Sequence, residues 1–184
     1  MKSNLEVFIA KFPELYDVLE QLNQNNIDWA IGGSGCLFLL GNERIPDDVD
    51  IFLRADQHDL ADKVFNIQSF QYTSETERVR NSNPGGAHAM QLTSNLQLTI
   101  ENKKYDLSLS EKTLAHRIKI QDYFLMPPEE VVLIKLLLQR GPEVGKYDIE
   151  DIEKFKAVYK LDNMYLKDRI VELDATERVK QYWK

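Results

Sequence analysis

A double glycine between two apolar segments is the feature that most constrains this sequence. Residues 27–31 (IDWAI) are short and apolar, and Gly32-Gly33-Ser34 follows at once, before a second apolar run that ends at Gly41. Glycine permits a left-handed backbone and a close approach of other atoms, and serine often caps a helix. The pattern predicts a buried strand, a tight turn and a short helix that Ser34 caps and Gly41 ends.

Two aspartates follow on the next predicted strand, DVDIFL. Strand alternation places Asp48, Asp50 and Phe52 on one face and the apolar residues on the other. Carboxylates ~7 Å apart along one strand disfavour each other's charge unless a cation lies between them. Mg²⁺ is often held by one or two carboxylates together with substrate phosphates. Such pairs also occur on solvated strands, so the pair alone does not establish a metal site.

The glycine turn strengthens the metal interpretation, because free backbone N–H groups at a strand-to-helix junction can hold a phosphate. Adjoining metal and phosphate sites are what phosphoryl or nucleotidyl transfer requires. A third acid would complete the cluster. Asp106, in KKYDLSLS, is the candidate because it lies between apolar residues, where a charge needs a partner. Glu101, across the predicted ENKK turn, is a weaker alternative.

The remaining pattern predicts an α+β fold, with a mixed sheet flanked by helices and a C-terminal helical subdomain. A helix is expected over 4–24, broken near Pro13, and residues 75–88 are the least regular. The other expected strands are 68–73, 90–94, 96–100, 105–110 and 117–126, and the other expected helices are 56–67, 128–140, 148–160, 162–173 and 174–184. We expect a core over residues 1–126 and the helical subdomain over 127–184.

Composition excludes several classes of protein. The 184 residues carry a net charge of −7, which argues against general binding to nucleic acid or anionic membranes. No apolar run approaches the ~18 residues of a membrane span, and the N-terminus lacks a signal-peptide pattern. The single cysteine, Cys36, excludes an internal disulfide and fits a reducing cytoplasm. It is expected to be a buried apolar residue, and the three histidines fit no zinc spacing.

The stretch GGSG…RIPDDVDI resembles the minimal nucleotidyltransferases of the DNA polymerase β superfamily. Their signature is a Gly-Gly or Gly-Ser turn, a short helix, an arginine and Asp-x-Asp on a strand. Many members have Arg-x-Thr-x-Asp-x-Asp, and here Pro46 stands where threonine is common. The stretch MPPEEVVLIKLLLQRGPEVGKYDIEDIEKF is similar to a helical pattern in relatives that include abortive-infection toxins. The resemblance covers about residues 28–155.

The resemblance implies a two-metal mechanism. Two Mg²⁺ ions held by Asp48 and Asp50 would bind the triphosphate of an NTP. The ion shared with Asp106 would lower the pKa of an acceptor hydroxyl for attack on the α-phosphorus, with Asp106 as the alternative base. The implied nucleotide-binding residues are Gly32, Gly33, Ser34, Arg44, Lys135 and Lys146.

Structural alternatives remain open for several of these residues. Arg44 has the alternative of pairing with Asp47 or Asp48, and Lys135 that of a structural lysine in an apolar helix. Asp148 and Asp151 are expected to cap and orient the last helices.

Three functions remain open. The leading one is Mg²⁺-dependent transfer of NMP from an NTP to a small molecule, a protein hydroxyl or an RNA end, in a toxin–antitoxin or phage-defence setting with a cognate antitoxin as partner. The second is nucleotide or partner binding without turnover, favoured if Asp106 lies away from Asp48 and Asp50. The third is an aminoglycoside-type modifying enzyme, which would need an acidic acceptor pocket.

Overall fold

The computed structural model describes residues 3–65, 71–73, 90–94 and 96–183. Two short helices open the chain: α1 (Asn4–Lys11), capped reciprocally by Ser3 and Glu6, and α2 (Leu15–Gln24). The predicted break near Pro13 is confirmed. The predicted irregular stretch 75–88 lies outside the described residues.

The central sheet is mixed, as predicted, with strand order β4-β2-β1-β8-β7. Strand β1 pairs antiparallel with β2 and parallel with β8, while β4 runs parallel to β2 and β7 antiparallel to β8. The bounds are β1 (Trp29–Ile31), β2 (Val49–Leu53), β4 (Met90–Thr93), β7 (Ile118–Ile120) and β8 (Tyr123–Leu125). The single strand predicted over 117–126 is therefore wrong, because the left-handed Gln121 (φ 51°) turns the chain between two strands.

A second, three-stranded sheet has the order β3-β5-β6. It consists of β3 (Gln71–Thr73), β5 (Gln97–Ile100) and β6 (Lys103–Asp106). The predicted hairpin turn is confirmed, with Glu101 and Asn102 both at positive φ. The strand predicted over 105–110 starts earlier and ends at Asp106. Helix α5 (Glu111–Ala115) follows it, which the sequence analysis did not predict.

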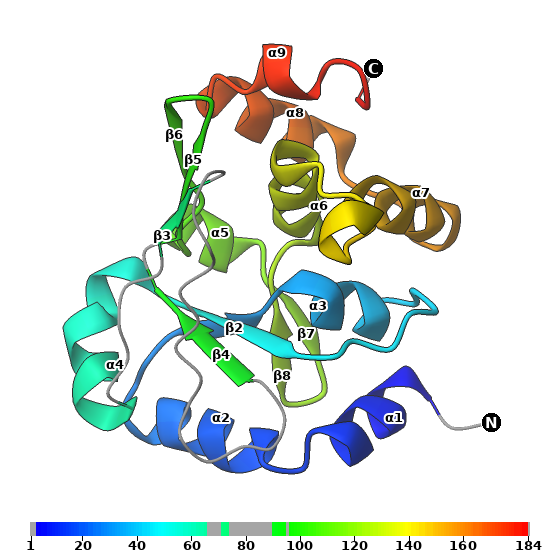
Figure 1. Cartoon of the computed structure of the whole chain (residues 1–184). Coiled ribbons are helices and arrows are strands. Elements are labelled where there is room, and N and C mark those ends of the chain that lie inside the picture. Colours follow the sequence, from blue (N-terminus) through cyan, green and yellow to red (C-terminus); the bar gives the residue numbers. More distant parts are fainter. Residues whose placement is uncertain (1–2, 66–70, 74–89, 95, 184) are drawn as a thin grey trace.

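Helices cover the sheet on opposite sides (Figure 1): α1 and α2 lie on one side, and the C-terminal helices gather around α6 on the other. Helix α6 packs against α3 and against the three helices that follow. The bounds are α3 (Gly33–Leu39), η1 (Ala55–Gln57), α4 (His58–Phe65), α6 (Pro128–Leu138), η2 (Pro142–Val144), α7 (Asp148–Val158), α8 (Asn163–Glu172) and α9 (Thr176–Val179).

Buried apolar side chains form one core that runs from α1 to α9. Helix α6 lies at its centre, with most of its residues buried, and ends at a left-handed Gln139 rather than near Gly141. The predicted boundary between a core over residues 1–126 and a helical subdomain over 127–184 stays a prediction. No helix in the described parts of the chain is long and apolar enough to cross a membrane.

Candidate active site

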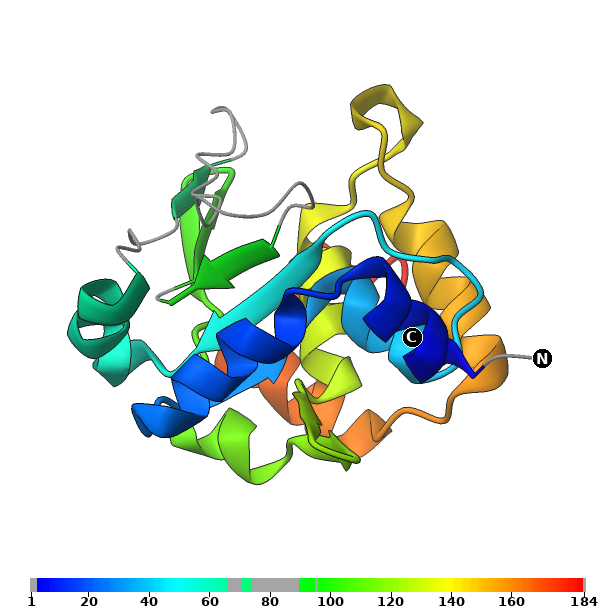
Figure 2. The ribbon, with the colours of Figure 1, turned by 90° about the horizontal axis from the view of Figure 1, so that it is seen from below.

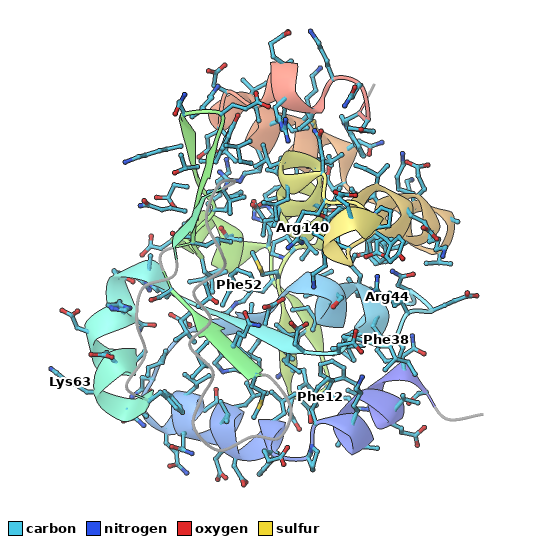
Figure 3. The ribbon with its side chains drawn as sticks, in the orientation of Figure 1. Phe12, Phe38, Arg44, Phe52, Lys63 and Arg140 are labelled. Atoms are coloured by element: carbon cyan, nitrogen blue, oxygen red, sulfur yellow. The ribbon has the colours of Figure 1, made fainter. Side chains whose placement is uncertain are left out.

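One pocket gathers seven of the nine site residues that the sequence predicts. It lies where the polar face of β2, the start of α3, helix α6 and the loop through η2 meet. Figure 3 shows the labelled Phe52 on β2 and Arg140 beyond α6, with Arg44 on the loop that follows α3. The seven residues are Gly33, Ser34, Arg44, Asp48, Asp50, Lys135 and Lys146.

The two glycines leave room for the side chains of β2, which pairs antiparallel with β1 and runs directly beside the turn. A Cβ at Gly33, whose φ is +55°, would lie 2.1 Å from Oδ2 of Asp50. A Cβ at Gly32 would lie 2.3 Å from Cε2 of Phe52, and the Gly32 N–H donates to the Asp50 carbonyl at 2.8 Å. The Asp50 carboxylate is thus seated against bare backbone.

The predicted capping role of Ser34 is wrong. Helix α3 begins at Gly33 and Gly32 is its N-cap, with no side-chain capping hydrogen bond. Ser34 therefore lies within the first turn of α3, where it lines the pocket. The lining at this end is built from Gly33, Ser34, Asp50 of β2 and Asp48 immediately before β2.

The predicted alternation of β2 is confirmed. Val49, Ile51 and Leu53 have no exposed surface, while Asp48 and Asp50 line the pocket. The described lining contains no histidine or cysteine, so its metal-binding groups are carboxylate oxygens, which suit a hard cation such as Mg²⁺ rather than zinc.

The structure does not bring Asp106 to this pocket. Strand β6 belongs to the second sheet, and its alternation turns Tyr105 and Leu107 inward and Asp106 outward. The exposed Asp106 carboxylate accepts a hydrogen bond from the Ser108 N–H at 3.0 Å. Among the described residues, no group of three or more acidic, histidine or cysteine side chains is placed to hold a metal ion. The role of Asp106 as third ligand stays a prediction without support from this geometry.

The basic wall of the pocket is an ion cluster on α6 and α7. The Nζ of Lys135, 7% exposed, donates to Oδ1 of Asp148 at 3.0 Å and to Oδ2 of Asp151 at 2.8 Å. Asp148 also accepts from the backbone N–H and Nε of Arg140, at 3.0 and 2.8 Å. This geometry explains a lysine in an apolar helix and favours its structural interpretation. Asp148 and Asp151, expected as caps, lie in the first turn of α7 and bind these cations.

The charge balance of the cluster fixes Asp148 as a carboxylate. Burial opposes its ionisation, but the hydrogen bonds from Arg140 and the charge of Lys135 outweigh burial and lower the pKa of Asp148. Breaking one partner of such a buried cluster leaves an uncompensated charge, which is strongly destabilising. The cluster therefore holds the loop between α6 and α7 at both ends.

Arg44 lies at the edge of this cluster. Its Nη1 is 3.7 Å from Oδ1 of Asp151, and its guanidinium lies 5.6 Å from the ring centre of Tyr147. Within the described parts of the chain it pairs with neither Asp47 nor Asp48, the alternatives that the sequence suggested. Figure 2 shows the η2 loop projecting from the body of the molecule.

Sequence reasoning missed Arg140 and the apolar floor of the pocket. Arg140 is the last residue of the predicted helix, and its position before Gly141-Pro142 was the available signal. The apolar lining comes from three elements, and no local pattern marks it: Phe52, Leu96, Leu98, Val131, Ile134 and Leu138.

The other chemically reactive side chains are outside this lining. Cys36 has no exposed surface, and burial raises the pKa of its thiol, which confirms the buried apolar interpretation. His58 contacts the Ser94 hydroxyl at 2.5 Å, and His116 packs on the ring of Tyr165. His88 lies outside the described residues.

The mixed sheet, the glycine turn and the paired aspartates define a polymerase β-like nucleotidyltransferase, as the sequence predicted. Residues 14–110, more than half of the chain, match the family described as aminoglycoside-2''-adenylyltransferase, and the chain belongs to that family. A search of curated protein sequences gave no match.

Two solved structures are also similar to this chain. The antibiotic-resistance factor ANT(2'')-Ia, solved in solution, is 12% identical with a TM-score of 0.47, over 96% of this chain and 98% of that one. An antigenic nucleotidyltransferase-like protein from Paracoccidioides brasiliensis is 16% identical with a TM-score of 0.41, over 97% and 92%.

Proposed function

We propose that this protein is a Mg²⁺-dependent enzyme that transfers NMP from an NTP to a hydroxyl group of an acceptor, in the cytoplasm. The observation that carries the proposal is the pocket in which Asp48 and Asp50 share one strand face beside Gly33. Basic side chains line the same pocket: Arg44, Lys135, Arg140 and Lys146.

The carboxylates of Asp48 and Asp50 are the groups that would hold Mg²⁺. A bound divalent cation supplies Lewis-acid charge to a phosphoryl group and lowers the pKa of a coordinated hydroxyl. Gly33 keeps backbone, rather than a side chain, against Asp50. The packing of Asp50 against the Gly33 backbone positions that carboxylate before substrate arrives, which limits the reorganisation that the reaction needs.

The cations divide into two roles. Lys135 and Arg140 are committed to Asp148 and Asp151, so they hold the pocket wall. Arg44, whose side chain is 40% exposed and whose contact with Asp151 is long, is the better candidate for a triphosphate. Lys146 lines the same pocket on the η2 loop. Bound phosphate would be neutralised by Arg44 and Lys146, with the ion cluster behind them.

The acceptor class is the open part of the proposal. The family's description makes an aminoglycoside the first acceptor to test, although the sequence analysis placed this option third. Such a polycation needs an acidic subsite, and the described lining carries four cations against Asp48, Asp50 and Asp151. A protein or RNA-end acceptor would fit a toxin–antitoxin or phage-defence role with a cognate antitoxin.

The test is transfer of α-labelled phosphate from each NTP, with Mg²⁺, to aminoglycosides, proteins and tRNA. We expect transfer to one acceptor class, and loss of transfer in Asp48→Asn and Asp50→Asn. Asp47→Asn is the matched control, because this exposed neighbour loses the same charge outside the pocket lining. Transfer that persists when Asp48 and Asp50 are both replaced would refute the site.

A second function, nucleotide binding without turnover, is favoured by one observation. Asp106 lies exposed on the second sheet, so the described pocket holds only two of the three metal-binding acids that the sequence suggested. Under this alternative, calorimetry would detect NTP binding that depends on Asp48 and Asp50, with no label transfer to any acceptor.

A further inference from the structure

A buried glutamine lies beside the two aspartates. Strand β4 runs parallel to β2, and its register places Gln91 opposite Asp50. Gln91 is 4% exposed, and its Nε2 donates to Oδ2 of Asp48 at 3.4 Å. One side chain of the neighbouring strand therefore adjoins both carboxylates.

We propose that Gln91 is a positioning residue that restrains Asp48 and leaves Asp48 and Asp50 as the two acids of the described cation site, so that metal binding depends on bound nucleotide. The inference rests on the proposed function. It concerns how the site takes its cation, and it assigns Gln91 no contact with substrate.

The argument begins with charge. Two carboxylates already adjoin at this place, and a third acid at position 91 would be buried next to both, which raises the cost of ionising all three. The uncharged amide avoids this repulsion and still donates a hydrogen bond to Asp48. Hydrogen bonds to a ligating carboxylate orient it, and their loss commonly lowers metal affinity about 10- to 100-fold.

The consequence is an incomplete cation site. Mg²⁺ usually completes its coordination with water and substrate phosphates when a protein offers only one or two carboxylates. Among the described residues no third acid joins Asp48 and Asp50. The phosphates of the nucleotide would therefore supply the missing negative charge, and metal and nucleotide would bind together.

The experiment measures Mn²⁺ affinity by electron paramagnetic resonance, with and without a non-hydrolysable NTP analogue. For the wild type we expect weak binding of Mn²⁺ alone and tighter binding with the analogue, whose phosphates add oxygen ligands. Gln91→Glu adds a carboxylate, so it should tighten binding of Mn²⁺ alone and shrink the effect of nucleotide. Gln91→Met keeps the size of the side chain but loses the amide, so it should weaken binding in the presence of the analogue.

The control is Gln97→Glu, which makes the same chemical change on the exposed face of β5. It should leave both affinities unchanged. Thermal unfolding of each variant tests for a purely structural role, which would lower the melting temperature and leave Mn²⁺ affinity as it was.

The outcomes separate the inference from the proposed function. If the wild type binds Mn²⁺ with nucleotide and the Gln91 variants match it, the inference is wrong and the proposed function stands. If Asp48→Asn and Asp50→Asn bind Mn²⁺ as the wild type does, the proposed site itself fails. Wild-type binding of Mn²⁺ that ignores nucleotide would also overturn the inference.

Discussion

The substitution Gly33→Ala directly displaces the Asp50 carboxylate in this pocket. The added Cβ would lie 2.1 Å from Oδ2 of Asp50, whereas such contacts are essentially never shorter than 3.0 Å. The carboxylate must therefore withdraw by about 0.9 Å. A misplacement of ~1 Å at a reacting centre commonly costs on the order of 100-fold in rate, and we expect that loss in label transfer by Gly33→Ala.

The same substitution also strains the backbone. A non-glycine residue in the left-handed region costs ~1–2 kcal/mol, and each kcal/mol lowers the melting temperature of a chain of this size by ~2–4 °C. We expect Gly33→Ala to melt ~2–8 °C lower than the wild type, with additional loss where Asp50 cannot withdraw freely.

Gly145→Ala is the matched control. Gly145 has a similar φ of +66°, but a Cβ there meets no atom within 4 Å. It should therefore lower the melting temperature by the strain alone and keep transfer activity. Equal rates of transfer by the two alanine variants would refute the claim that the missing side chain at Gly33 is needed to position the Asp50 carboxylate.

Three further perturbations test the ion cluster and the third acid. Lys135→Met leaves Asp148 and Asp151 without their shared cation, so urea unfolding should show a loss of ~3–5 kcal/mol in the free energy of unfolding. The control Lys154→Met breaks only an exposed pair with Glu150 and should unfold as the wild type does. Because the pKa of Asp148 is lowered in the folded protein, its stabilising contribution is present above the ordinary aspartate pKa of ~3.9 and is lost as the pH falls through the lowered value. Urea titrations from pH 6 to 2 should therefore show a steeper loss of unfolding free energy for the wild type than for Asp148→Asn. Parallel curves would contradict this. Asp106→Asn should transfer label at the wild-type rate, because the carboxylate is exposed and bonds to its own strand end; a loss as large as that of Asp48→Asn would show that Asp106 reaches the metal after all.

The local part of the site could be predicted from sequence because its determinants are close along the chain. Alternation in DVDIFL was enough to place Asp48 and Asp50 on the polar face. The glycine pair after an apolar strand was enough to predict that other atoms come close to the backbone of the turn. The group that comes close to the turn is the carboxylate of Asp50 itself, which the sequence pattern did not reveal.

Long-range pairing was the part that could not be predicted. Alternation shows that Asp106 points to the opposite face from Tyr105 and Leu107, but it does not show which sheet β6 joins. Lys135 was conspicuous in an apolar helix, yet its partners lie 13 and 16 residues away on another helix. The turn at Gln121 was missed because it lacks glycine and proline, the usual signals of a reversal.

The paired aspartates of this pocket and three of its four described cations come from two different stretches of the chain. Asp48, Asp50 and Arg44 lie within residues 14–110, which match the family, whereas Lys135, Arg140, Lys146 and Asp151 lie beyond that span. The matched span therefore includes both aspartates and Arg44 but leaves the other three cations of the pocket outside it. Chimaeras that exchange residues 127–184 between relatives would therefore alter nucleotide preference while they retain the paired aspartates.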